Sequence, residues 1–240
     1  MQIRATFRTS FLCLLVACLS SVSSAVGVVD DDAGVAINQS SYLVYPPLML
    51  YNAIYYGEAR VVISVDENGR LTDHLVIGYT NEAFAEAAVG ALKRWSYEPA
   101  RARGKARASR AEVLFIFRDK GVIVQNFPGA LENYRTIGAM QDRYAFKPCK
   151  LSELDRIPNP LHVVPPVSAK SSQPHTVTVE FYIDEEGRVR MPAVARESAD
   201  DAYAASAVAA VEQWRFEAPL RKGRPVLVYV QQPFSFRPKD

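Results

Sequence analysis

The chain has 240 residues, of which 49% are hydrophobic and 22% charged, and its formal net charge at pH 7 is +2. This size and composition are ordinary for a globular protein and leave room for two small domains. Arg4 and Arg8 supply the whole net charge, since residues 1–25 contain no acid and the remaining chain is formally neutral. A neutral chain has no overall electrostatic attraction to nucleic acid or to an anionic membrane, so we predict neither as a partner through charge.

Residues 1–25 have the pattern of a secretory signal peptide. Arg4 and Arg8 give a positive start, Phe11–Leu19 is apolar, and Ser23-Ser24-Ala25 offers a small-residue cleavage site. The nine apolar residues are too few to span a bilayer as a helix. We therefore predict an exported protein.

A second processing route is open. Leu15-Val16-Ala17-Cys18 resembles the lipobox of bacterial lipoproteins, in which Cys18 would be acylated and become the N-terminus. Lipidation at Cys18 is the one route by which we predict membrane association. Both routes lead to export, and an uncleaved N-terminal anchor is the remaining alternative.

Residues 26–41 have no sustained periodicity and are predicted to be a tether. The first repeat is predicted over residues 42–127. Its expected elements are two strands, a helix and a third strand, at Glu58–Val65, Leu71–Tyr79, Glu82–Arg94 and Ala111–Arg118.

A turn at Asp119-Lys120-Gly121 indicates a further strand at Val122–Phe127. Ala130–Tyr144 has apolar residues at helical spacing. Prolines then mark a linker over residues 128–160.

The second repeat is predicted over residues 161–240. Apolar residues alternate along Val177–Ile183, Asp184–Gly187 suits a hairpin turn, and a second strand begins near Val189. A helix at Asp200–Trp214 and a last strand at Pro225–Phe236 complete it. The predicted fold class is α+β, with two tandem ββαβ modules, each a small antiparallel sheet with one helix packed on one face.

The two repeats match each other at a nearly constant offset. The offset is 118 for Ala59, Val61, Ile63, Val65, Asp66 and Gly69, which precede Val177, Val179, Phe181, Ile183, Asp184 and Gly187. After a one-residue insertion it is 119 for Phe84, Ala88, Leu92, Trp95, Tyr97, Gly104, Phe115 and Phe117, which precede Tyr203, Ala207, Val211, Trp214, Phe216, Gly223, Phe234 and Phe236. So many matching positions indicate a tandem duplication.

Catalytic residue patterns are scarce. His74, His162 and His175 stand in three separate contexts without metal-ligand spacing, and no phosphate-binding glycine loop or nucleophile motif occurs. We predict that the chain is not an enzyme and needs no cofactor or metal. Cys149 is expected to be an incidental linker thiol, although flanking cations would lower its pKa.

Two other features have structural and functional interpretations. Trp95 and Trp214 each end an apolar helical stripe, which favours a place in the core over ligand stacking. A basic run before the last strand of the first repeat is interpreted as a solvated loop or as a patch for an anionic partner. It comprises Arg101, Arg103, Lys105, Arg107 and Arg110.

A three-stranded sheet has two edges whose free backbone groups can pair with an incoming strand. The last strand of each repeat is the predicted edge, over Glu112–Phe117 and Leu227–Gln232. Pro233 removes one donor next to the second edge.

Both repeats resemble the C-terminal domain of TonB, the periplasmic energy transducer. The resemblance rests on Tyr45-Pro46, Val65–Arg70 and Lys93–Pro99 in the first repeat, and on Asp184–Val189, Gln213–Phe216, Gly223–Val226 and Pro233–Phe236 in the second. It implies a last strand that accepts an extended peptide, the TonB box of outer-membrane transporters. It also implies the partner-binding residues Tyr45, Pro46, Val113, Phe115, Val228 and Val230.

The departures from TonB affect the expected function. The apolar segment is too short for the membrane helix of TonB, the Pro-rich spacer is absent, and Val44 replaces the family's Gln before Tyr45-Pro46. We therefore expect a periplasmic or outer-membrane-anchored binding or scaffold protein that accepts a peptide strand and is linked to outer-membrane transport. The alternative is an active transducer that drives transport through outer-membrane receptors.

Overall fold

The computed structural model describes residues 34–39, 43–102, 104–128, 143–167, 175–194 and 201–236. It has a mixed α+β fold built mainly from antiparallel sheets, so the predicted fold class is confirmed at this level. Arg103 of the basic run and most of the helix expected at 130–144 lie outside the described residues.

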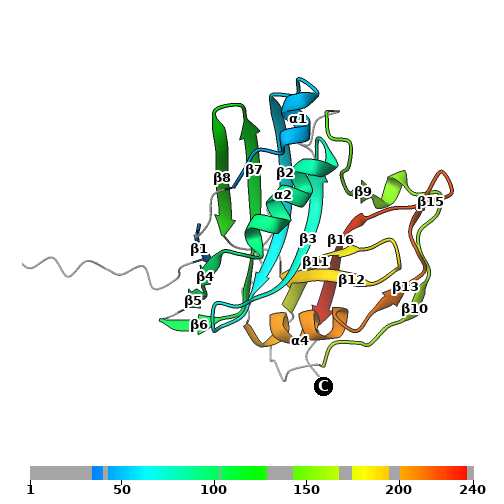
Figure 1. Ribbon diagram of the computed structural model, residues 1–240. Coiled ribbons are helices and arrows are strands. Elements are labelled where there is room, and N and C mark those ends of the chain that lie inside the picture. Colours follow the sequence, from blue (N-terminus) through cyan, green and yellow to red (C-terminus); the bar gives the residue numbers. More distant parts are fainter. Residues whose placement is uncertain are drawn as a thin grey trace, which may run out of the picture. The chain divides into compact units, whose positions relative to one another are not determined.

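The first repeat forms a four-stranded sheet in the order β3-β2-β7-β8. Helix α2 (Glu82–Leu92) lies across one face (Figure 1), with Phe84 and Leu92 buried against the sheet. The side chain of Asn81 caps the start of this helix by accepting a hydrogen bond from the backbone N–H of Ala83, at 3.0 Å. The strands are β2 (Tyr56–Val65), β3 (Leu71–Tyr79), β7 (Ser109–Arg118) and β8 (Gly121–Pro128).

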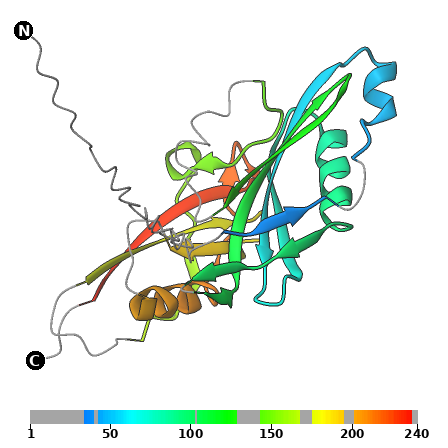
Figure 2. The same ribbon diagram turned by 90° about the vertical axis from the view of Figure 1, so that its left-hand side faces the viewer.

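The second repeat forms a sheet in the order β12-β11-β16-β9. Helix α4 (Asp201–Val211) packs on it through Tyr203, Ala207 and Val211. The strands are β9 (Cys149–Lys150), β11 (His175–Ile183), β12 (Val189–Val194) and β16 (Val228–Phe236). Figure 2 shows β11 and β16 running together as a long antiparallel pair.

Short elements connect and flank these sheets, so each repeat is more elaborate than two strands, a helix and a strand. They are α1 (Pro47–Tyr51), β1 (Ala36–Asn38), β4 (Ser96–Glu98), β5 (Ala100–Ala102), β6 (Lys105–Arg107), η1 (Leu151–Glu153), β10 (Pro160–His162), β13 (Arg215–Phe216), β14 (Leu220–Arg221) and β15 (Arg224–Pro225).

Equivalent glycines close the first hairpin of each repeat. Gly69 and Gly187 both have φ of 79°, a left-handed conformation that favours glycine. A Cβ atom at Gly187 would lie 2.0 Å from the carbonyl oxygen of Phe216, and one at Gly69 would lie 2.4 Å from that of Tyr97. Glycine is therefore required both by the turn and by the close approach of the chain that follows the helix.

The expectation that Cys149 is an incidental linker thiol is wrong. Cys149 is buried in β9, which pairs in parallel with the start of β16. Burial raises the pKa of the thiol, and the nearby Arg221 opposes this effect. A segment expected to be linker thus supplies a strand to the second sheet.

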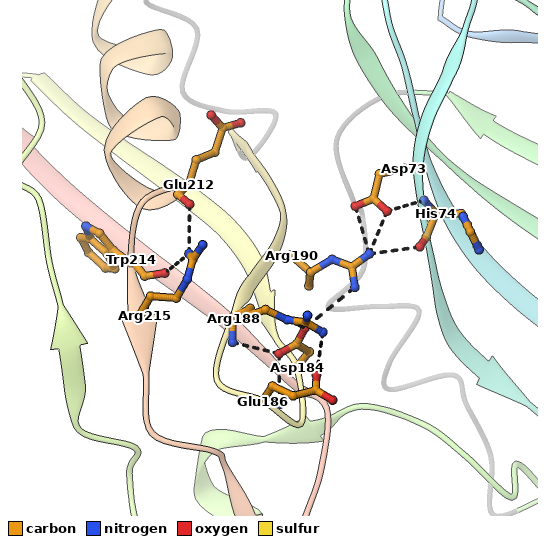
Figure 3. A network of polar contacts seen from close by, with 9 residues as sticks. All are labelled: Asp73, His74, Asp184, Glu186, Arg188, Arg190, Glu212, Trp214 and Arg215. Carbon is orange, nitrogen blue, oxygen red and sulfur yellow. Dashed lines mark hydrogen bonds and ion pairs between the residues drawn. The ribbon is translucent and has the colours of Figure 1, made fainter.

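The two sheets share an apolar cluster on the faces turned away from α2 and α4. Its buried members are Val62, Ile77, Tyr144, Tyr182, Met191, Leu227 and Tyr229. Beside it, Arg190 Nη2 lies 2.8 Å from Asp73 Oδ1 and donates to the backbone oxygen of His74 at 3.3 Å (Figure 3). Apolar contact and an ion pair therefore join the repeats.

Candidate peptide-binding edge

The last strand of the first repeat, β7, is not a sheet edge. It pairs with β2 along its whole length and with β8 from Ala111 to Arg118. The prediction of an open edge at Glu112–Phe117 is therefore wrong. The cause is the two-residue turn Asp119-Lys120, which folds β8 back onto β7. The further strand predicted at Val122–Phe127 is confirmed as β8 and removes the edge.

Val113 and Phe115 consequently lie in the interior of the fold. Their side chains are fully buried in the core beneath α2, and their strand has partners on both sides. Neither residue can accept an added strand while β8 stays paired.

The last strand of the second repeat, β16, differs from β7 because it is paired along its whole length on one side only. One side pairs with β11 along the whole strand, from Val228 to Phe236. The other side pairs with β9 only at Val228 and Tyr229. Among the described residues, no strand pairs with that side from Val230 to Phe236.

The open side of β16 from Val230 to Phe236 can be compared with the equivalent part of β7 in the first repeat. At the offset of 119, Phe234 and Phe236 of β16 correspond to Phe115 and Phe117 of β7. The part of β7 that β8 covers begins at Ala111, which corresponds to Val230. The open stretch of β16 is thus the stretch that a strand occupies in the first repeat.

The backbone of β16 alternates between its two neighbours. The backbone N–H of Cys149 donates to the oxygen of Leu227, at 2.8 Å, so the odd-numbered residues face the side of β9. The polar backbone groups of Gln231, Pro233 and Ser235 therefore face the open side. The equivalent residues of β7 face β8, because a two-residue hairpin closes on a hydrogen-bonded pair at Arg118 and Gly121.

Pro233 fits this arrangement. Its missing N–H faces the open side, so the proline removes no hydrogen bond from the pairing with β11. The open edge offers the N–H and carbonyl groups of Gln231 and Ser235, while the carbonyl oxygen of Pro233 accepts a hydrogen bond from Gln232 Nε2 at 3.0 Å.

Val228 and Val230 have a different role from the one expected of them. Their side chains are buried in the core beneath α4, and their polar backbone groups face β11. They hold the strand in place, while Gln231 and Ser235 carry the open backbone. The alternation of a strand predicts this division once the pairing partners are known.

A buried carboxyl group lies behind the open edge. Gln231 Nε2 donates to Glu180 Oε1 at 2.8 Å and to the hydroxyl oxygen of Tyr229 at 3.1 Å. Glu180 is only 4% exposed, and its Oε2 has no partner among the described residues. Burial raises the pKa of Glu180, and hydrogen bonds from Gln231 and Tyr229 partly oppose this.

Tyr45 and Pro46 lie in the first repeat, away from β16. The ring of Tyr45 packs edge-on against Phe84 and Phe117, and its hydroxyl donates to the backbone oxygen of Ile54 at 2.7 Å. Pro46 precedes the first turn of α1. Tyr45 therefore packs on the core of the first repeat, two residues before α1 begins.

A polar cluster on the first sheet was not predictable from the sequence. Glu58 accepts hydrogen bonds from Tyr56 and Tyr144 and pairs with Arg143 at 2.6 Å. Burial by itself would raise the pKa of Glu58, but the hydrogen bonds from Tyr144 and Tyr56 and the positive charge of Arg143 lower it overall. Arg143 and Tyr144 come from the region beyond β8, so no local pattern signalled the contact.

One known family matches both repeats. It is described as Gram-negative bacterial TonB protein C-terminal, and it matches residues 41–118 and 164–238. No curated protein and no solved structure matches the chain. Within the described residues, no helix is both long and apolar enough to cross a membrane.

The TonB C-terminal family consists of non-enzymatic binding domains of the Gram-negative envelope that interact with outer-membrane receptor proteins. Its two matched segments coincide with the duplicated sequence pattern and with the strands that the two main sheets share, while β8 and β9 lie outside the match. The chain belongs to the TonB C-terminal family and carries its domain twice.

Proposed function

We propose that this chain is an exported binding or scaffold protein that accepts an extended peptide by strand addition to the open stretch of β16. The partner is a segment of an outer-membrane or periplasmic protein. In this proposal the second repeat binds and the first repeat does not, because β8 already covers the corresponding stretch of β7.

The observation that carries the proposal is the position of β8. This strand lies antiparallel on β7 along residues that correspond to Val230–Arg237. An added peptide on β16 would take the same place and the same direction. Its backbone would pair with Gln231 and Ser235, and it would lose one hydrogen bond at Pro233.

The same comparison predicts the side chains of the peptide. Val122 and Val124 of β8 lie opposite Phe117 and Phe115. The corresponding residues of β16 are Phe236 and Phe234, and Phe234 is half-buried with its ring 5.6 Å from that of Trp214. A peptide with branched apolar residues at these alternate positions would extend the core beneath α4.

Binding a partner in the outer membrane or periplasm requires that the chain is exported, but it does not require a membrane anchor on the chain. We propose a periplasmic chain that begins after Ala25, with acylation at Cys18 and attachment to the outer membrane as the other processing route. Mass spectrometry of the N-terminus of the native protein distinguishes these forms. Retention of Met1 to Ala25 would contradict both.

The test uses a peptide with the sequence of β8, Gly121 to Pro128, as the added strand. Binding is measured by calorimetry with the exported chain and with a Ser235→Pro variant. The substitution removes an N–H that faces the open side and leaves the pairing with β11 intact. We expect the variant to bind about tenfold more weakly, the effect of about one lost hydrogen bond.

Val124→Pro is the matched control. Its N–H faces away from β7, so the substitution removes an outward N–H from an edge of the first sheet, although the side chain of Val124, unlike that of Ser235, packs against the core. This variant should bind the peptide like the parent chain. Unchanged binding by Ser235→Pro, or an equal loss in both variants, would contradict the proposal. Circular dichroism checks that both variants remain folded.

A further inference from the structure

The two repeats carry equivalent short hairpins ahead of their last strands. In the first repeat β5 and β6 pair with Ala102 opposite Lys105, and in the second β14 and β15 pair with Arg221 opposite Arg224. Gly104 and Gly223 occupy the same turn position, with φ of 74° and 71°. The two glycines therefore share the same left-handed conformation.

In the second repeat this hairpin holds a carboxylate. The two oxygens of Asp155 accept hydrogen bonds from the backbone N–H groups of Lys222 and Gly223, each at 2.7 Å. A second acid, Glu153, lies 3.4 Å from Arg221. The hydrogen bonds from Gly223 and Lys222 lower the pKa of Asp155, which means that the turn stabilises the anionic form.

In the first repeat the hairpin carries more positive charge than in the second. Arg101, Lys105 and Arg107 are exposed, and no acid in the described part of the chain forms an ion pair with them. The guanidinium of Arg101 donates to the oxygen of Gly104 at 3.1 Å, so this cation is held over the turn. Lys105 and Arg107 alternate with Ala106 and point to one face.

We propose that the β5–β6 hairpin is a carboxylate-binding site that takes an Asp or Glu side chain, as the β14–β15 hairpin takes Asp155. The N–H of Gly104 supplies a backbone donor, and Lys105 and Arg107 supply the charge. The site is distinct from the open edge of β16 and does not depend on strand addition.

The carboxylate has two possible sources, the same chain or a partner protein. Within the chain, β1 pairs with β4 as β10 pairs with β13, with Ile37 opposite Tyr97 and Pro160 opposite Phe216. Asp155 precedes Pro160 by five residues, and Asp32 precedes Ile37 by five. The placement of Asp32 lies outside the described residues.

Amide chemical shifts of Gly104 and Lys105, measured at about 10 mM ionic strength to limit screening, test the proposal. One arm compares the exported chain with Asp31→Asn and Asp32→Asn variants. The other arm adds a capped Asp-Asp-Asp-Gly peptide. A shift in the first arm identifies the chain's own carboxylate, and a shift in the second identifies a partner's. Either shift supports the carboxylate site.

Three variants serve as controls. Asp155→Asn must move the amide signals of Lys222 and Gly223, because the contact is present there. Lys105→Gln should weaken peptide binding, or reduce the Asp32-dependent shift, by about two- to fivefold. Lys120→Gln, an exposed cation in the β7–β8 turn, should have no effect. No shift in either arm overturns the proposal, and so does a shift with inorganic phosphate but not with the acidic peptide.

Discussion

Trp95 and Trp214 are large aromatic residues of the first and the second core. They are 6% and 8% exposed, as the helical stripes predict. Trp95 stacks on Phe115 at 5.8 Å, and the indole N–H of Trp214 donates to the backbone oxygen of Val164 at 2.8 Å. Replacing either with Ala should cost about 3–5 kcal/mol of unfolding free energy, and replacing it with Phe should cost less. Urea denaturation measures both, and Ala variants as stable as the parent would contradict this packing.

Glu180 should give the stability of the protein a distinct pH dependence. Its pKa is raised in the folded state, so folding favours its protonated form and stability falls as the pH rises from the unfolded value of about 4.3. Glu180→Gln should therefore be more stable than the parent at pH 7, by about 1 kcal/mol, and equal to it at pH 4 and below.

Unfolding free energies at pH 4, 5.5 and 7 measure this difference. Glu67→Gln, in an exposed turn, should follow the parent at every pH. The same pH dependence in parent and Glu180→Gln would show that the buried carboxyl group is not the cause.

At the scale of an element, substitution of Gly187 tests whether the first hairpin of the second repeat requires glycine in its turn. Gly187→Ala introduces a Cβ atom 2.0 Å from the oxygen of Phe216 at a φ of 79°. It should destabilise the protein by about 1–3 kcal/mol or more. Gly90→Ala in α2 is the contrasting variant, since its Cβ atom meets only Arg94 Nη1 at 3.5 Å. That variant should gain up to about 1 kcal/mol of stability. Chemical denaturation should therefore show a lower unfolding free energy for Gly187→Ala and a higher one for Gly90→Ala than for the parent.

The long elements were predictable because their apolar periodicity is strong. The helices expected at 82–94 and 200–214 occupy Glu82–Leu92 and Asp201–Val211. The sheet edges were less predictable, since an edge depends on which strand pairs with which. Strand β8 and the tight turn before it were both indicated by the sequence, and the hairpin that they form covers the edge expected at Glu112–Phe117. Strand β9 has only two residues and follows a proline, so no periodicity could indicate it.

At the scale of the whole molecule, the shared apolar cluster should make the two repeats unfold together. Trp214→Phe leaves Trp95 as a fluorescent probe of the first repeat, and Trp95→Phe leaves Trp214 as a probe of the second. In each variant, the fluorescence of the remaining Trp and any second probe of folding should show the same urea transition. Adding Ile77→Ala, which truncates the cluster in the first repeat, should lower both midpoints. A shift confined to the Trp95 signal would show that the repeats are independent.

The central claim is that β16 keeps an open edge from Val230 to Phe236, and amide hydrogen exchange tests it most directly. In the free protein the amides of Gln231 and Ser235 should exchange rapidly, whereas those of Val230, Gln232 and Phe234, which face β11, should be protected. Adding the β8-sequence peptide should protect Gln231 and Ser235 and leave the other three unchanged. If Gln231 and Ser235 are already as protected as their neighbours in the free protein, the edge is occupied and the account is contradicted.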